Sequence, residues 1–373
     1  MFKRIKGCFD NTAVNTGRQR ELDIAKGFAI ILMSFSHGIE ILGWFFDPQR
    51  TDGFFWDGFD MLIKGVAPVF ILCMGISLCY SRNQSASALF RRALRMAGIV
   101  ALLELFRTVI PCLVEWLIFR DWESIDYIDQ VFCVDILQFT TMAMLAIALL
   151  KKLKVGPVAM LAIASACSVV GQLLQGVSTG SVAGDFAAGF LWHTTDIAYF
   201  PFLSWFIVPV IGYVFGQAWL RLADKATFFQ WVTPISLGIT ALYYASMLIV
   251  GKWYYFSGED YCGIGLADVL FMFVIFFAVL GGCYYLNRWI PCIARALASM
   301  GGRVNSVYCI HWVIYAFLYV ALACVLDEER YLPLWTVVPT AVLVLVAADL
   351  LSRLYKKSRK KGAAQSPVEA SKA

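Results

Sequence analysis

One histidine lies beside a carboxylate in an arrangement that suits acid–base chemistry. His37 precedes Glu40 by three residues, close to one turn of a helix. An imidazole titrates near neutrality, so it can accept and return a proton, and a carboxylate one turn away can orient it. We therefore take His37 and Glu40 as candidate catalytic residues. The sequence leaves a structural alternative open, in which a hydrogen-bonded core histidine lies below a glutamate that reaches the surface.

The same stretch carries more polar residues on one helical face. On a helix, Asp23, Lys26 and Ser34 fall within an arc of about 120° that also holds His37 and Glu40. Asp23 and Lys26 are three residues apart and can form an ion pair. His37 follows Asp23 by about 21 Å along the axis. In a membrane helix this places His37 in the outer half, and the stripe must face protein or water.

Other ionisable residues interrupt later apolar stretches. Glu104 and Arg107 are three residues apart, and we interpret them as a self-neutralising pair that pins two helices. Lys64, Asp135 and Asp268 lie near the ends of their apolar stretches. We take these three as candidate substrate-binding residues, and a purely structural role is equally compatible with their positions.

Three arginines, Arg91, Arg92 and Arg95, cluster around the start of the third apolar stretch. Planar guanidinium groups fit phosphate groups well, so this cluster is a candidate site for a phosphorylated cofactor. The alternative is a positively charged anchor at the cytoplasmic surface of a membrane.

These residues need a membrane scaffold. Hydrophobic types make up 60% of the 373 residues and charged types 15%, against about 45–50% and about 25% in soluble domains. This composition excludes a water-soluble globule, a disordered chain and a nucleic-acid-binding domain. A bilayer is crossed by roughly 20 apolar residues of helix. Ten spans are predicted, namely Leu22–Phe45, Met61–Tyr80, Ala93–Cys112, Val134–Leu150, Val155–Gln175, Tyr199–Leu220, Trp231–Val250, Gly265–Leu286, Val304–Leu326 and Leu332–Leu351.

Basic residues give these spans an orientation. Most of the 31 Lys and Arg residues lie in the two terminal segments and in alternate connecting segments, which are therefore expected in the cytoplasm. We predict an all-α polytopic bundle in the lipid bilayer, with both termini cytoplasmic. It comprises an N-terminal tail (1–21), a transmembrane domain (22–352) and a basic C-terminal tail (353–373). The plasma membrane is the default compartment, since no signal addresses an organelle.

Several segments share an ordered likeness to one family. The opening stretch RQRELDIAKGFAIILMSFSH places an Arg, a Leu-Asp pair, a basic residue with Gly, and a His in and around one span. Later landmarks are GVAPVFILCMGISL, RRALRM, VDILQF, YFPFLSWFIVPVIGYVFGQ and SMGGRVNSVYCIHWVIY. In this order the segments resemble the catalytic-domain family of heparan-alpha-glucosaminide N-acetyltransferase, an integral-membrane acyltransferase related to the acyltransferase-3 group.

The resemblance implies transfer of an acyl group, with acetyl-CoA as the expected donor, to a carbohydrate or glycolipid acceptor at the outer face. It implies no metal. By position it makes His37 the acid/base, with Asp23 and Lys26 as support at the inner end of its helix. The residues that it assigns to the donor site are Arg91, Arg92 and Arg95 for the CoA phosphates, and Asn305 and His311 for the pocket wall. The eukaryotic lysosomal members of the family carry a histidine in the loop after the first span. The corresponding loop here, FFDPQRTDGFFWDG, has no histidine. The resemblance therefore favours direct transfer over an acyl-histidine intermediate.

The rival interpretation is a transporter or exporter of a small polar molecule or glycan. Such a protein would use the polar stripe of the first span as a proton or substrate path. The lack of an internal repeat, which marks many secondary transporters, weighs against it. A homodimer is compatible with the sequence.

Overall fold

The computed structural model describes residues 2–43, 58, 61, 63–120, 128–256, 261–325 and 332–369, and within these ranges every regular element is a helix. The loops that follow the first and ninth predicted spans fall largely outside the described residues, and the loop that follows the third falls partly outside them. The helices are α1 (Phe2–Lys6), α2 (Arg20–Leu42), α4 (Val66–Cys79), α5 (Ala86–Glu104), the π-helical turn η2 (Leu105–Val109), α6 (Ile110–Phe119), the 3₁₀ turn η3 (Ile128–Phe132), α7 (Ile136–Lys152), α8 (Pro157–Leu173), α9 (Val182–Gly189), α10 (Phe202–Trp205), α11 (Ile207–Trp219), α12 (Lys225–Val250), α13 (Leu266–Trp289), α14 (Pro291–Gly301), α15 (Val304–Ala323) and α16 (Leu334–Glu369).

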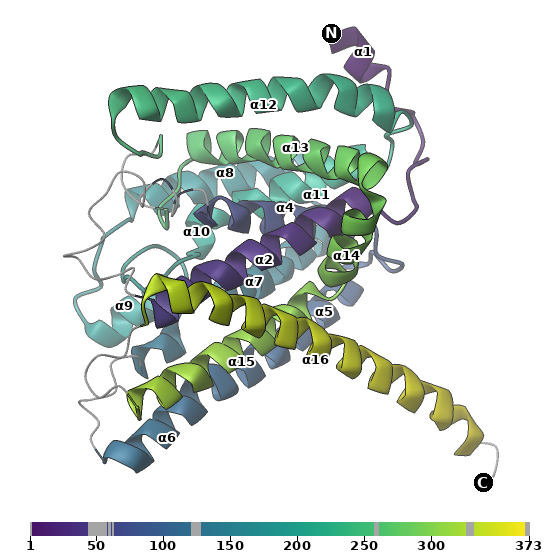
Figure 1. The fold of residues 1–373 in the computed structure, drawn as a ribbon. Coiled ribbons are helices and arrows are strands. Elements are labelled where there is room, and N and C mark those ends of the chain that lie inside the picture. Colours follow the sequence, from purple (N-terminus) through teal and green to yellow (C-terminus); the bar gives the residue numbers. More distant parts are fainter. Residues whose placement is uncertain are drawn as a thin grey trace.

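The ten predicted spans all coincide with helices. Among the described residues, eight helical runs are long and apolar enough to cross a membrane, and α4 and α8 are shorter apolar helices. The all-α polytopic fold is therefore confirmed. In the view of Figure 1, α1 and the last turns of α16 both lie toward the right-hand side, with α1 at the top and α16 at the bottom.

Two helices extend more than ten residues beyond their predicted spans. The third span is part of one helical run, Ala86–Phe119, in which α5, η2 and α6 follow each other without a break. The tenth span continues as α16 to Glu369, through the basic segment predicted as a tail, and projects from the bundle (Figure 1). Helix-forming Lys, Arg and Ala residues favour this continuation, and no Pro or Gly interrupts it before residue 362.

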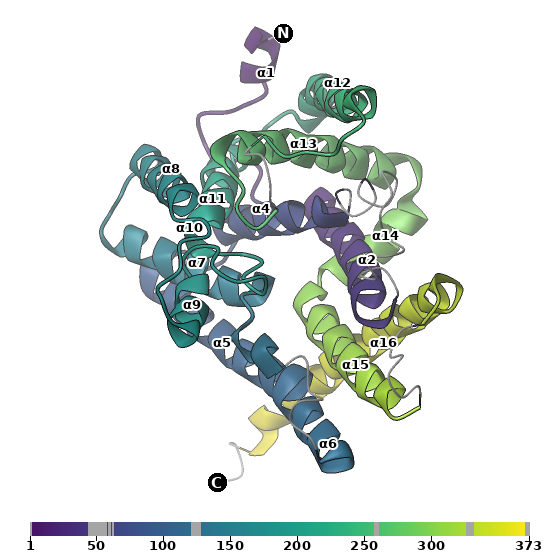
Figure 2. The same ribbon diagram turned by 90° about the vertical axis from the view of Figure 1, so that its left-hand side faces the viewer.

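Helix α2 occupies the centre of the bundle. It packs against α4, α13, α14, α15 and α16, and the view in Figure 2 shows it surrounded by these helices. The predicted polar stripe of α2 thus faces other helices, as its charged residues require.

Two glycines allow α2 to cross α14 closely. A Cβ atom on Gly27 would lie 2.1 Å from the backbone oxygen of Leu297, and one on Gly301 would lie 1.9 Å from the backbone oxygen of Asp23. Small residues let membrane helices approach to backbone contact. The crossing therefore fixes the N-terminal half of α2 against the segment that leads into α15.

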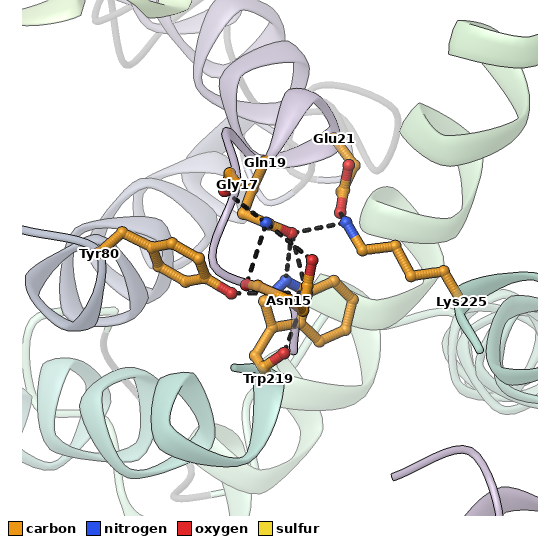
Figure 3. Close-up of polar contacts among 7 residues, drawn as sticks. All are labelled: Asn15, Gly17, Gln19, Glu21, Tyr80, Trp219 and Lys225. Atoms are coloured by element: carbon orange, nitrogen blue, oxygen red, sulfur yellow. Dashed lines mark hydrogen bonds and ion pairs between the residues drawn. The ribbon is translucent and has the colours of Figure 1, made fainter. Parts of the chain in front are cut away.

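A polar network fastens the chain's N-terminal segment beneath α2 (Figure 3). The Asn15 side-chain amide donates to the backbone oxygen of Trp219 at 2.9 Å and to the side-chain oxygen of Gln19 at 3.1 Å. The same Gln19 oxygen accepts from the indole of Trp219 at 3.0 Å and from Lys225 at 2.6 Å, and Lys225 also binds Glu21. This network ties the start of α2 to the junction between α11 and α12.

Candidate functional site

His37 and His311 form a hydrogen-bonded pair between α2 and α15. The Nδ1 atom of His37 lies 2.9 Å from the Nε2 atom of His311, and the two rings are parallel to within 4°. His311 has no exposed surface, whereas His37 is half-buried. The indole of Trp312 packs against the His37 ring, with centroids 4.2 Å apart.

The contacts of His311 determine which nitrogens carry protons. Its Nδ1 atom lies 3.0 Å from the carbonyl oxygen of Val307, which can only accept. A neutral His311 therefore donates from Nδ1 and accepts at Nε2. His37 must then donate from Nδ1, which leaves its Nε2 lone pair free to accept a proton. This assignment rests on the hydrogen-bond network.

The pair corrects one prediction about depth. The sequence predicts His37 in the outer half of the membrane, and the position of His311 early in its predicted span, Val304–Leu326, puts His311 in the inner half. Contact between the two rings instead places them at the same level. The reason is the short helix α14, because its last residue, Gly301, packs on Asp23. Helix α15 therefore starts beside the first two turns of α2.

His37 lines a cavity of about 210 Å³. Its wall combines charged groups with aromatic rings, a combination that binds and orients polar ligands. Four of the predicted site residues lie in this wall: His37, Glu40, Lys64 and Asp135. The other lining residues are Met33, Ser36, Ile39, Ile63, Ala67, Arg107, Gln130, Cys133, Tyr199, Phe200, Tyr261 and Trp312.

Arg107 enters this wall from the π-helical turn. Its guanidinium group binds Glu104 at 2.8 Å, which confirms the predicted pair, and also Asp135 at 3.0 Å. It lies 4.7 Å from the ring centroid of Trp312, within cation–π range. A π turn inserts one residue into a helix and commonly occurs at functional sites. Here it directs a buried cation to the cavity.

The carboxylate of Asp135 connects three helices at the cavity wall. It caps α7 by accepting from the backbone N–H of Ile136 at 2.6 Å, and it also accepts from the hydroxyl of Tyr308 on α15. Gln138 donates to the carboxylate of Glu104 at 2.6 Å. Buried charges of both signs are thus paired and hydrogen-bonded, as a membrane interior demands.

Residues 18–249 match the family described as heparan-alpha-glucosaminide N-acetyltransferase, catalytic. This match covers more than half of the chain. The chain belongs to this family. Comparison with curated proteins and with solved structures gives no match. The protein is therefore a multi-pass membrane protein of an acetyltransferase family, and the family match includes His37, Arg107 and Asp135.

Two predicted catalytic residues lie away from the cavity, at the other end of α2. Asp23 binds Lys26 at 3.0 Å, as the spacing predicts, and also binds Arg18 at 2.7 Å. Fourteen residues, about 21 Å along the helix, separate Asp23 from His37. Both residues fall within the matched family region.

The candidate donor-binding residues are distributed over two helices. Arg91 and Arg95 are exposed on α5, and Arg92 donates to the backbone oxygen of Asn83 at 3.4 Å. Arg95 precedes Arg107 by twelve residues, about 18 Å along the helix. On α15, Asn305 lies six residues before His311. The three arginines therefore lie toward the start of α5 and Asn305 toward the start of α15, whereas His311 contacts His37.

Asp268 lies in the first turn of α13, outside the wall of the cavity that His37 lines. It accepts from the backbone N–H groups of Phe256 at 2.6 Å and Gly265 at 3.2 Å, which closes the loop before α13. It lines a second cavity of about 20 Å³ beside Tyr243 and Tyr244. The side chain of Tyr261 lines both cavities.

Sequence reasoning missed the aromatic part of the wall. Trp312 contacts both His37 and Arg107 in the wall, and Tyr308, behind the wall, binds Asp135. The sequence analysis predicted a role for neither residue. A usable signal was present, because Tyr308, His311 and Tyr315 recur at helical spacing on one face of α15. Cys133 and Tyr261 carry no comparable signal.

Proposed function

We propose that this protein transfers an acetyl group from cytoplasmic acetyl-CoA to a carbohydrate acceptor at the outer side of the plasma membrane. The observation that carries the proposal is the position of His37 in the cavity wall, with Nδ1 hydrogen-bonded to His311 and Nε2 as the basic nitrogen. A base that lines a cavity with polar and aromatic side chains can accept the proton of a hydroxyl or amine bound there. Family membership supports the reaction class.

The proposed step is direct transfer. The acceptor O–H or N–H gives its proton to Nε2 of His37 while its oxygen or nitrogen attacks the thioester carbon. The carbon–sulfur bond then breaks, and the leaving CoA thiolate takes the proton from the imidazolium of His37. The carbonyl oxygen gains negative charge during the step, and the guanidinium of Arg107 in the same wall would stabilise it.

The cavity wall supports a sugar acceptor. Sugar rings offer apolar faces and many hydroxyl groups, so aromatic side chains and charged side chains bind them together. Tyr199, Phe200 and Tyr261 provide the first kind, and Glu40 and Lys64 the second. The volume of about 210 Å³ is below the roughly 300–1,000 Å³ of sites for larger ligands. One sugar residue, or the end of a glycolipid headgroup, matches this size.

The donor would approach from the inner end. Arg91, Arg92 and Arg95 on α5 are the proposed partners of the CoA phosphates, with Asn305 beside the path to His37. This arrangement requires both termini, with the segments 1–21 and 353–373, to lie in the cytoplasm.

The test measures transfer from labelled acetyl-CoA in membranes, with D-glucosamine and methyl α-D-glucoside as acceptors. His37→Ala should lower the rate by about 10²–10⁴-fold, the usual worth of a general base. His193→Ala is the matched control, because His193 lies outside the cavity wall. Equal transfer by His37→Ala and His193→Ala would refute the role of His37.

The transporter alternative predicts a different result. A pure transporter of sugars has no reason to bind acetyl-CoA, so acetyl-CoA should not raise its thermal stability. An acetyltransferase should be stabilised by RT ln(1 + [L]/Kd), about 2.7 kcal/mol at a hundredfold excess over Kd. Absence of stabilisation together with acceptor uptake into vesicles would favour transport.

A further inference from the structure

His311 has the position of a residue that acts through another one. Its imidazole has no exposed surface, and its two nitrogens are both engaged, Nδ1 with the Val307 carbonyl and Nε2 with His37. It therefore cannot touch an acceptor in the cavity directly. It also lies on α15, beyond residues 18–249 that match the family.

We propose that His311 is a positioning residue that holds His37 in the proton arrangement required for catalysis. This proposal rests on the proposed acetyltransferase function. A base with one ring proton works only if the unprotonated nitrogen faces the substrate. By accepting from Nδ1 of His37, His311 keeps the proton on that nitrogen and leaves Nε2 as the acceptor.

The opposite arrangement is unfavourable in this structure. If the proton between the rings belonged to Nε2 of His311, a neutral His311 would point a lone pair at the Val307 oxygen, 3.0 Å away. Two acceptors would then face each other in a fully buried place, at a cost of a lost hydrogen bond. A doubly protonated His311 would place a second positive charge in a fully buried position, where the carboxylates of Glu104 and Asp135 are already paired with Arg107.

The surroundings keep His311 in place. The rings of Tyr308 and Tyr315 meet it edge-on, with centroids 5.3 Å and 5.8 Å away. Tyr315 is itself fixed, because its hydroxyl donates to the backbone oxygen of Ser34 on α2 at 2.8 Å. The same contact joins α15 to α2 one turn before His37. Both partners of the imidazole pair are thus held in register.

During the reaction this contact would carry no net proton transfer. Nε2 of His37 gains the acceptor's proton, and the positive charge of the imidazolium is shared with the Nδ1–H group. His311 stabilises that charge through its Nε2 lone pair, and the proton on Nε2 of His37 then leaves with the CoA thiol. His311 ends the cycle with the same protons as it began.

Three substitutions separate positioning from packing. His311→Gln places an amide oxygen near the former Nε2 and keeps an acceptor for His37. His311→Asn is shorter, with its oxygen near the former Nδ1, and His311→Leu has no acceptor. We expect His311→Asn and His311→Leu to lower kcat about 100-fold or more with KM for the acceptor nearly unchanged, and His311→Gln to retain activity within about tenfold.

A spectroscopic measurement tests the same point without a substitution. The chain contains three histidines, so ¹⁵N-histidine labelling of the full-length protein in lipid nanodiscs gives few signals, and the His37→Gln spectrum assigns them. The expected result is a His37 ring protonated at Nδ1 and unprotonated at Nε2. In His311→Leu this preference should be lost.

The outcomes are distinguishable. A wild-type protein that transfers no acetyl group refutes the proposed function and, with it, the catalytic use of the pair. An active wild type refutes the role of His311 alone if its His37 is protonated at Nε2, or if His311→Leu keeps the wild-type kcat. An equal loss in the Gln and Leu variants would also overturn it, since only packing would then matter.

Discussion

Replacing Gly27 by alanine tests the central helix crossing of the bundle. The added Cβ would meet the oxygen of Leu297 at 2.1 Å and its carbonyl carbon at 2.7 Å, whereas ordinary contacts begin near 3.4 Å. Both obstructing atoms belong to backbone and cannot rotate away. Helices α2 and α14 would therefore have to separate by roughly 1 Å or more, in a region where packing is tight.

The size of the effect follows from two opposing terms. Overpacking by one methyl group costs about 1–3 kcal/mol, and an immovable backbone obstacle favours the upper end. Alanine in place of glycine improves helix formation by about 1 kcal/mol. We expect a net loss of about 2 kcal/mol for Gly27→Ala, seen as a lower apparent Tm of the purified protein at a fixed heating rate.

A matched control makes the same glycine-to-alanine substitution at a helical position where no clash arises. Gly98 also lies inside a helix, α5, and a Cβ there would meet nothing within 4 Å. Gly98→Ala should therefore raise the apparent Tm or leave it unchanged. Gly301→Ala strains the same crossing from the α14 side. The double variant should therefore lose less stability than the sum of the losses in Gly27→Ala and Gly301→Ala. A Gly27→Ala protein as stable as Gly98→Ala would show that α2 and α14 are not in backbone contact.

Three further predictions concern the site and the orientation. Arg107→Met leaves Glu104 and Asp135 buried without their cation and should cost about 3–5 kcal/mol; thermal melting should show partial recovery when Glu104→Gln is added, and an unchanged Tm in Arg107→Met would contradict the buried network. Gly38→Ala would bring a Cβ to 2.7 Å from the Tyr315 hydroxyl; it should reduce acetyl transfer about tenfold or more by shifting α15 against α2, and full activity would argue against tight coupling of the two helices. Reporters fused to either end should be active only in the cytoplasm, and an external signal from one end would refute the even number of crossings.

The sequence predicted the helices well because hydropathy reports them directly. Each stretch of about 20 apolar residues became a helix. The stripe on Leu22–Glu40 faces other helices and is buried at Ser34 and half-buried at its ionisable residues, because charges in a bilayer need protein partners. The local pairs, Asp23 with Lys26 and Glu104 with Arg107, also followed from spacing along one helix.

The partners between helices could not be predicted in the same way. A polar stripe shows that a helix faces protein, but not which helix it faces. The contact of His37 with His311 joins residues 274 positions apart, and it depends on the glycine crossing at Gly27 and on the short helix α14. Trp312 contacts both His37 and Arg107. A search for ionisable residues inside apolar stretches does not find it, because a tryptophan side chain carries no charge.

The π turn at Leu105–Val109 makes Arg107 unusually sensitive to chain length. One extra residue in this turn shifts the rotational phase of everything that follows by about 100°. Deleting a single residue here would restore an uninterrupted α-helix of the same hydropathy, yet would turn one half of the helix away from its partners. Function would then be lost although every residue of the cavity wall is still present in the sequence. Among related sequences, a one-residue gap at this turn would therefore distinguish proteins that lack this cavity from proteins that have it.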